Sequence, residues 1–241
     1  MAPRAAPGPI VERLARDLHD RGPGDPMAEE LLEWLATSAR FRAFAEAHRD
    51  KIRKKLRTAH DAEALRDVRA ELRAAQLLLS DPRVELAFEA YGSARGGPDF
   101  TVSYRGSGTF NLEVTRLRRV PGATATAYGA PLLAKLRQLP PSVPNAVLVA
   151  IEGDTADAFD VAAATHSLRS RADAKDEAFF TRRGFEGTHG FYERYLRLGA
   201  VFVWCEDAVG DARAAPWTNR SARIALPERA VRACLGCLRN A

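Results

Sequence analysis

The sequence predicts an α/β fold in which a mixed central sheet follows a helical N-terminal segment. Apolar residues recur at helical spacing over residues 27–79, whereas residues 83–117 alternate apolar and polar side chains as half-buried strands do. Residues 146–151 form a continuous apolar run, which is typical of a strand buried on both faces and parallel to its neighbours. The chain has 241 residues, of which 46% are hydrophobic and 28% charged, so it can bury a substantial core.

The N-terminal part is predicted to contain little besides helices. Residues 1–26 are rich in Ala, Pro and Gly and are expected to be disordered or weakly structured, apart from a short helix over 10–19. A helical segment follows over 27–60. Its basic run at 51–57 places Ile52 and Leu56 on one helix face, so the cations point elsewhere. This run is either a solvated helix face or a surface that contacts phosphate groups.

The α/β core is predicted to span residues 61–241. It begins with a helix over 61–79, which Asp81-Pro82 ends. Strands are expected over 83–91, 99–104 and 110–117, and the short turn 105–109 makes the last two a hairpin. The remaining expected elements are helices over 128–139, 156–169, 191–198 and 227–238, a strand over 200–205, a mobile loop over 173–190, and a strand edge with a turn over 217–222.

Two acidic residues on neighbouring strands are the strongest candidates for a site. Asp99 begins one strand of the hairpin and Glu113 lies in the middle of the next. With a turn centred near Ser107, Asp99 lies opposite Thr115, and the two acids become diagonal neighbours on one face, roughly 7 Å apart at the backbone. Two carboxylates at this separation, with the Val114 carbonyl and water, suit Mg²⁺ or Mn²⁺.

The element order over residues 61–151, together with Pro98-Asp99 and Glu113-Val114-Thr115, resembles the PD-(D/E)xK nuclease superfamily. The resemblance implies a restriction-endonuclease-like αβββαβ core and metal-dependent hydrolysis of DNA. It also implies that Glu71, on the first helix, joins Asp99, Glu113 and Val114 around Mg²⁺. Gln138 resembles the polar residue that many members carry on the helix before the fourth strand.

Thr115 departs from the family motif, in which a lysine orients the attacking water and stabilises the charge of the transition state. Threonine can hydrogen-bond but supplies no cation. Lys135, one helical turn before Gln138, is predicted to supply the charge, since Arg116 should face away from Thr115 along the strand. The alternative is that hydrolysis has been lost and the fold binds nucleic acid or a protein partner without cleaving it.

Composition limits the other functions. The formal net charge of +5 favours an anionic partner, here taken to be DNA. The three cysteines argue against a disulfide scaffold, and Cys234 and Cys237 are expected on the apolar side of the C-terminal helix. No apolar run is long enough to cross a membrane and no signal-peptide core is present, so a cytoplasmic protein is expected. Walker-type and nucleophile-elbow motifs are absent from the sequence.

Overall fold

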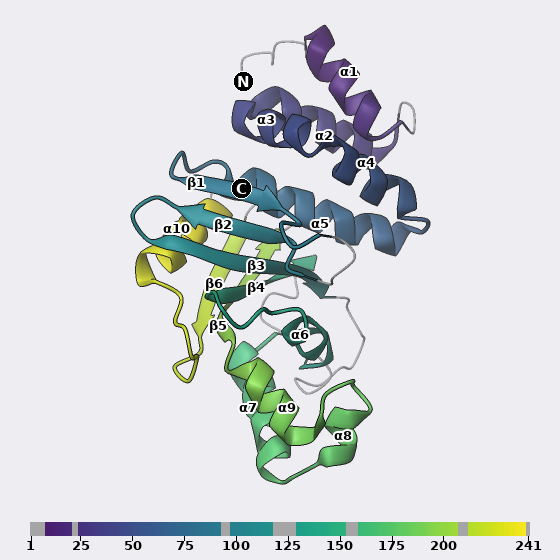
Figure 1. Ribbon diagram of the computed structural model, residues 1–241. Coiled ribbons are helices and arrows are strands. Elements are labelled where there is room, and N and C mark those ends of the chain that lie inside the picture. The colour runs from purple at the N-terminus through teal and green to yellow at the C-terminus, as the bar shows by residue number, and fades with distance from the viewer. Residues whose placement is uncertain are drawn as a thin grey trace. The chain divides into compact units, whose positions relative to one another are not determined.

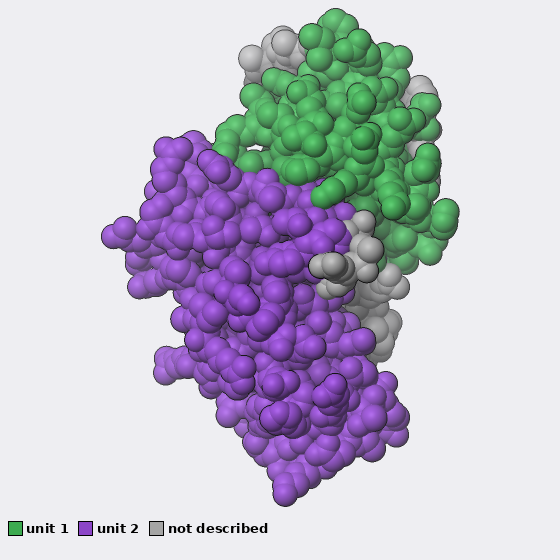
Figure 2. Space-filling view, viewed as in Figure 1, with its two compact units in different colours: residues 1–80 green, residues 81–241 purple. Residues whose placement is uncertain are grey.

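The computed structural model describes residues 8–20, 24–92, 97–117, 129–152, 159–206 and 212–239, and the chain forms two compact units (Figures 1 and 2). The N-terminal unit spans residues 1–80 and is green in Figure 2, and the C-terminal unit spans residues 81–241 and is purple. The helix that was expected to open the α/β core at residue 61 is therefore part of the N-terminal unit. The boundary differs from the expected one because this helix packs with the helices that precede it.

The described part of the N-terminal unit is built from helices, which are α1 (Pro9–Leu18), α2 (Pro26–Thr37), α3 (Ala39–Ala47), α4 (Arg49–Thr58) and α5 (Ala62–Leu78). Helix α1 confirms the short helix expected over residues 10–19. Polar side chains begin three of the helices: Asp25, Ser38 and Asp61 each accept a hydrogen bond from a backbone N–H in the first turn. The apolar stripes of these helices form the core of the unit, with Leu31, Leu35, Phe41, Ile52, Leu56 and Leu72 fully buried.

Helix α4 has the predicted division between an apolar face and a basic face. Ile52 and Leu56 are each 1% exposed, whereas Lys51, Arg53, Lys54 and Arg57 are exposed. Lys55 is half-buried and pairs with Glu71 of α5. The apolar spacing therefore predicted correctly which face of this short helix packs inward.

The C-terminal unit contains a six-stranded sheet in which the strands follow one another in chain order. The strands are β1 (Val84–Phe88), β2 (Phe100–Tyr104), β3 (Gly108–Leu117), β4 (Asn145–Glu152), β5 (Leu198–Glu206) and β6 (Ala212–Thr218). Strands β1, β2 and β3 are antiparallel, β3, β4 and β5 are parallel, and β6 closes the sheet antiparallel to β5. The predicted hairpin, the parallel inner strand and the closing edge strand are all present.

Four helices contribute side chains to one buried cluster on the face of the sheet to which residue 117 of β3 points. They are α6 (Gly129–Leu136), α7 (Val161–Asp173), α8 (Glu177–Thr181) and α9 (Gly187–Tyr195). Leu133 and Leu136 of α6 pack with Val147 and Val149 of β4 in one buried cluster. Helix α6, which follows β3 and precedes β4 along the chain, lies against β3 (Figure 1).

Residues 173–190 were expected to be a mobile loop, and this expectation is wrong. The segment contains α8 and the start of α9, and Phe180 is fully buried with its ring centroid 4.6 Å from that of Phe191. Aromatic anchors within an otherwise polar segment therefore order it. Gly184 and Gly187 adopt positive φ angles, 77° and 63°, at the bends between the helices.

The C-terminal helix α10 (Glu228–Arg239) packs against β6 and β5. Cys234 and Cys237 are 2% and 4% exposed, which confirms that they lie on its inner face, and burial raises the pKa of Cys234. In the described part of the chain, no helix has both the length and the apolar character that a membrane crossing requires.

Candidate functional site

Asp99 and Glu113 lie side by side at the open end of the β2–β3 hairpin. The observed register pairs Phe100 with Leu112, so the next residues outward on the two strands are Asp99 and Glu113. The expected diagonal arrangement is therefore wrong: Asp99 lies opposite Glu113, whereas it was expected opposite Thr115, two residues further along β3. Gly106, which has a φ of 83°, is the centre of the turn, one residue earlier than expected, and this shift changes the whole register.

Hydrogen bonds to the backbone hold the two acids together. The N–H of Asp99 donates to Glu113 Oε2 at 3.1 Å, and the N–H of Val114 donates to Asp99 Oδ2 at 2.8 Å. Asp99 is 8% exposed and Glu113 is 1% exposed. Each carboxylate is thus held by the backbone of the opposite strand, and the hairpin itself determines where the acids lie.

Lys135, the predicted substitute for the motif lysine, contacts this acid pair. Its Nζ donates to Glu113 Oε1 at 2.5 Å, and its side chain is 22% exposed. The lysine lies in the last turn of α6, which packs on the face of β3 that carries Glu113. The structure therefore brings a cation to the acids from a different element.

Gln138 follows α6 and also faces Glu113. In the amide orientation that satisfies its hydrogen bonding, Nε2 donates to both carboxylate oxygens of Glu113, at 3.1 Å from Oε2. Both oxygens of Glu113 consequently receive hydrogen bonds from protein groups. Gln138 therefore lies with Asp99 and Lys135 around Glu113.

The other candidate residues of β3 have the orientations that strand alternation predicts. Thr115 is half-buried and lies on the same face as Glu113, whereas Val114 and Arg116 point to the opposite face and are 3% and 8% exposed. The N–H of Val114 points toward Asp99, and the carbonyl of a residue in an extended strand points to the same side as its N–H. The Val114 carbonyl is therefore directed toward the acid pair.

The charges of the acid pair suit a divalent cation. Burial, followed by the negative charge of Asp99, raises the pKa of Glu113 to about 7, although Lys135 acts in the opposite direction. A further positive charge between the carboxylates would favour the ionised form. Mg²⁺ is commonly held by one or two carboxylates and completes its shell with water and phosphate, and this pair offers such a donor set. Among the described residues, no group of three or more His, Cys, Asp or Glu side chains is placed to hold a metal.

Glu71 lies on α5 in the N-terminal unit, whereas the other candidate residues belong to the C-terminal unit. Its carboxylate pairs there with Lys55, and the two side chains are 14% and 23% exposed. A role for Glu71 as a metal ligand comes from the resemblance and stays a prediction.

A buried polar network that the sequence analysis missed lies beside the acid pair. Asn111, two residues before Glu113, is fully buried, and its Nδ2 donates to Asn145 Oδ1 at 3.1 Å. Thr101 donates to Asn111 Oδ1 at 3.2 Å. Asn145 Nδ2 donates to the carbonyl oxygens of Pro140, Val143 and Arg197 at 2.9, 2.8 and 3.1 Å. These bonds tie the segment after α6 to the sheet, and asparagines at the edges of apolar runs were the signal for them.

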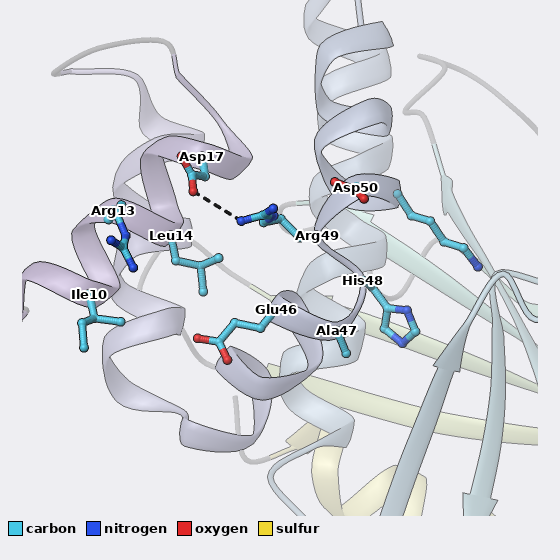
Figure 3. Close-up of a pocket in the computed structure, with 10 residues that line it drawn as sticks. Ile10, Arg13, Leu14, Asp17, Glu46, Ala47, His48, Arg49 and Asp50 are labelled. Carbon is cyan, nitrogen blue, oxygen red and sulfur yellow. Dashed lines mark ion pairs between the residues drawn. The ribbon is translucent and has the colours of Figure 1, made fainter.

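Two cavities lie between α1 and α4 of the N-terminal unit, and neither is lined by a predicted site residue. The first has a volume of about 750 Å³, and Arg49 and Asp17 face each other across it with a nitrogen–oxygen distance of 3.7 Å (Figure 3). The second has a volume of about 510 Å³ and is lined by Arg16, Arg53 and Arg57 together with Asp17 and Asp20. Charges of both signs line each cavity, so neither presents a field of one sign.

Comparison of the chain with protein-family models, with curated proteins and with solved structures yields no match. The candidate site is therefore defined by its own geometry. In the C-terminal unit, two buried acids of a hairpin meet a lysine and a glutamine from the end of one helix, and a threonine lies on the same strand face.

Proposed function

We propose that this chain is a metal-dependent nuclease that hydrolyses phosphodiester bonds of DNA at the acid pair of its C-terminal unit. The observation that carries the proposal is the convergence of Asp99, Glu113, Lys135 and Gln138 in one partly buried corner. The succession α5–β1–β2–β3–α6–β4 is the element order of a restriction-endonuclease-like core and supports the proposal. The net positive charge of the chain favours an anionic polymer as the substrate.

Asp99, Glu113 and the Val114 carbonyl would hold Mg²⁺ or Mn²⁺. Such an ion, when bound, activates a water and neutralises charge on the scissile phosphate. Because the pair supplies few protein ligands, we expect weak binding of the ion until substrate phosphate completes its shell.

The protein groups have separate tasks in this proposal. Lys135 places a positive charge beside Glu113, where it can stabilise the anionic transition state and orient a water in place of the motif lysine. Gln138 donates to Glu113 and keeps that carboxylate in position. Thr115 lies on the same face and can exchange a hydrogen bond with water, but it carries no charge.

One observation favours the alternative, a nuclease-fold protein that binds nucleic acid or a protein partner without cleaving it. Lys135 donates to Oε1 of Glu113, Gln138 donates to both of its carboxylate oxygens, and the residue is only 1% exposed. In the alternative, Lys135 serves as a permanent counter-ion of Glu113 and takes the place of a metal.

A cleavage assay separates the two functions. Duplex DNA, single-stranded DNA and RNA are incubated with the full chain in Mg²⁺, in Mn²⁺ and in EDTA. We expect metal-dependent cleavage that Glu113→Gln abolishes and that Glu85→Gln, at an exposed position of β1, leaves intact. If the wild type cleaves nothing but Thr115→Lys acquires metal-dependent cleavage, the natural protein is a binding module.

A further inference from the structure

Three arginines form a cluster outside the acid pair. Arg194 lies in α9, Arg197 follows that helix, and Arg223 follows β6. The N–H of Arg223 donates to the carbonyl of Leu196 at 2.8 Å, which holds the two segments against each other. Burial lowers the pKa of Arg197, and the positive charges of Arg194 and Arg223 lower it too, against the opposing effect of Glu193. The guanidinium groups of Arg194 and Arg223 are therefore each close enough to that of Arg197 to repel it.

The cluster is physically connected to the acid pair. Arg197 Nη1 donates to the carbonyl oxygen of Leu139 at 3.2 Å, while the preceding residue, Gln138, faces Glu113. Two consecutive residues thus contact the two groups of charges. The carbonyl oxygen of Arg197 also accepts a hydrogen bond from Asn145, the first residue of β4.

The spacing of strands in a sheet gives the approximate distance between the arginine cluster and the acid pair. Asn145 pairs with Asn111 of β3 on one side and with Leu198 of β5 on the other. Since adjacent strands lie about 5 Å apart, the start of β5 is about 10 Å from β3 across the sheet. A ligand that reaches both the acids and the arginines must therefore be larger than a single phosphate group.

Within the described residues no guanidinium group of the cluster forms an ion pair, although the negative charge of Glu193 acts on Arg197. Arg197 Nε is buried there without a hydrogen-bond partner. Arg223 is exposed and Arg194 half-buried, and neither guanidinium makes a hydrogen bond or ion pair with the described part of the chain. Like charges held together are unfavourable unless an anion offsets them, and guanidinium groups match phosphate oxygens in bidentate geometry.

We propose that Arg194, Arg197 and Arg223 form a subsite for the phosphate groups of a nucleic-acid backbone, beside the position of the scissile bond. The inference rests on the proposed function for naming nucleic acid as the ligand. It does not require that cleavage takes place. The acid pair would act on one phosphodiester while the arginines hold another phosphate of the same strand.

The test measures binding in EDTA, where metal-dependent cleavage does not occur. Fluorescent duplex and single-stranded oligonucleotides are titrated with wild type, with Arg194→Ala/Arg223→Ala, and with a control, Arg213→Ala/Arg229→Ala, which removes two exposed arginines from the same unit. We expect the cluster variant to bind about tenfold more weakly or worse. We also expect its salt dependence to flatten by roughly one to two units, because each lost phosphate contact removes about 0.9 unit. The control should change affinity by less than about twofold. Arg194→Lys/Arg223→Lys keeps the charges but not the bidentate geometry, so it should keep the salt slope of wild type and bind with an affinity between those of wild type and the alanine variant.

Equal losses in the cluster variant and the control would overturn the inference, as would a wild type that binds inorganic phosphate but no nucleic acid. The proposed function fails separately. If wild type binds through the cluster but cleaves nothing in Mg²⁺ or Mn²⁺, the subsite stands and the nuclease does not. If wild type cleaves but the cluster variant binds and cleaves as wild type does, the nuclease stands and the subsite does not.

Discussion

Each of the two units contains a glutamate–lysine ion pair, and the two pairs differ in their burial and in their neighbouring charges. In the N-terminal unit, Glu71 of α5 pairs with Lys55 of α4, and both side chains are partly exposed. In the C-terminal unit, Glu113 of β3 pairs with Lys135 of α6, but the Glu113 side chain is 1% exposed and Asp99 lies beside it. The residue types are the same, whereas the surroundings differ.

Burial and a second carboxylate account for the difference. An ion pair on partly exposed helices usually contributes about 1 kcal/mol or less, since water screens both charges. At Glu113, burial and Asp99 raise the pKa to about 7 even though a lysine is in contact. Acids held in such an unfavourable state are characteristic of functional sites. Changes at the Glu113 pair should therefore affect function, and matched changes at the Glu71 pair should affect it much less.

The largest expected effect is on turnover when a carboxylate of the acid pair is neutralised. Asp99→Asn and Glu113→Gln should each lower metal-dependent cleavage on the order of 10³-fold, because both remove charge that the ion and the transition state require. Calorimetry should show a Mn²⁺ signal in wild type that Asp99→Ala abolishes. Glu71→Gln should lower cleavage less than tenfold (roughly the effect of one partly exposed charge). A loss in Glu71→Gln as large as that in Asp99→Asn would make Glu71 a metal ligand, as the family resemblance implies.

The second-largest effect on turnover is expected from Lys135, in comparison with Lys55 of the other glutamate–lysine pair. Lys135→Ala should reduce turnover roughly 10²-fold, the scale of losing an oriented electrostatic or acid–base partner. Thr115→Lys in the Lys135→Ala background should restore activity, since it returns a cation to the motif position. Lys55→Ala, the matched change in the N-terminal unit, should leave turnover near wild type. Unchanged turnover in Lys135→Ala would mean that this lysine serves only as a structural counter-ion of Glu113.

A stability measurement across pH tests the buried acid directly. Glu113 has an ordinary pKa of 4.5 and a folded-state pKa of about 7, so the folded state binds the extra proton between these values. Stability should therefore fall as pH rises through this window, by up to about 3 kcal/mol for a shift of this size. Urea unfolding between about pH 5 and pH 8 measures the slope. Glu113→Gln should flatten it and Glu71→Gln should not, and Mn²⁺ should bind wild type more tightly at the upper end of the range.

The smallest effect is expected from the basic face of α4. Lys51→Ala/Lys54→Ala should weaken DNA binding modestly and flatten its salt slope by up to about one unit per lost contact. Arg13→Ala/Arg66→Ala removes two charges from other exposed positions of the same unit and serves as the control. If the α4 variant keeps both the affinity and the slope of wild type, this face is solvated and the N-terminal unit does not contact phosphate through it.

Much of the architecture could be read from local patterns. Alternation along β3 predicted that Glu113 and Thr115 share a face and that Val114 and Arg116 take the other, because side-chain direction in a strand depends only on position. The continuous apolar run at 146–151 predicted that β4 is a buried strand parallel to its neighbours. The hairpin register could not be read in this way, since Gly106 and Gly108 both adopt positive φ angles and the register depends on the residue at which the turn is centred.

The sequence alone identified the two acids, predicted that they share a face, and indicated Lys135 and Gln138 as candidate site residues. The contacts among them depend on the folded chain: Lys135 reaches Glu113 only because α6 packs across β3, 22 residues further along. The same holds for the Asn111–Asn145 bond, the raised pKa of Glu113 and the meeting of Arg197 with Arg223. Side-chain periodicity is a property of neighbouring residues, whereas distance, burial and charge coupling arise between segments that are remote in sequence.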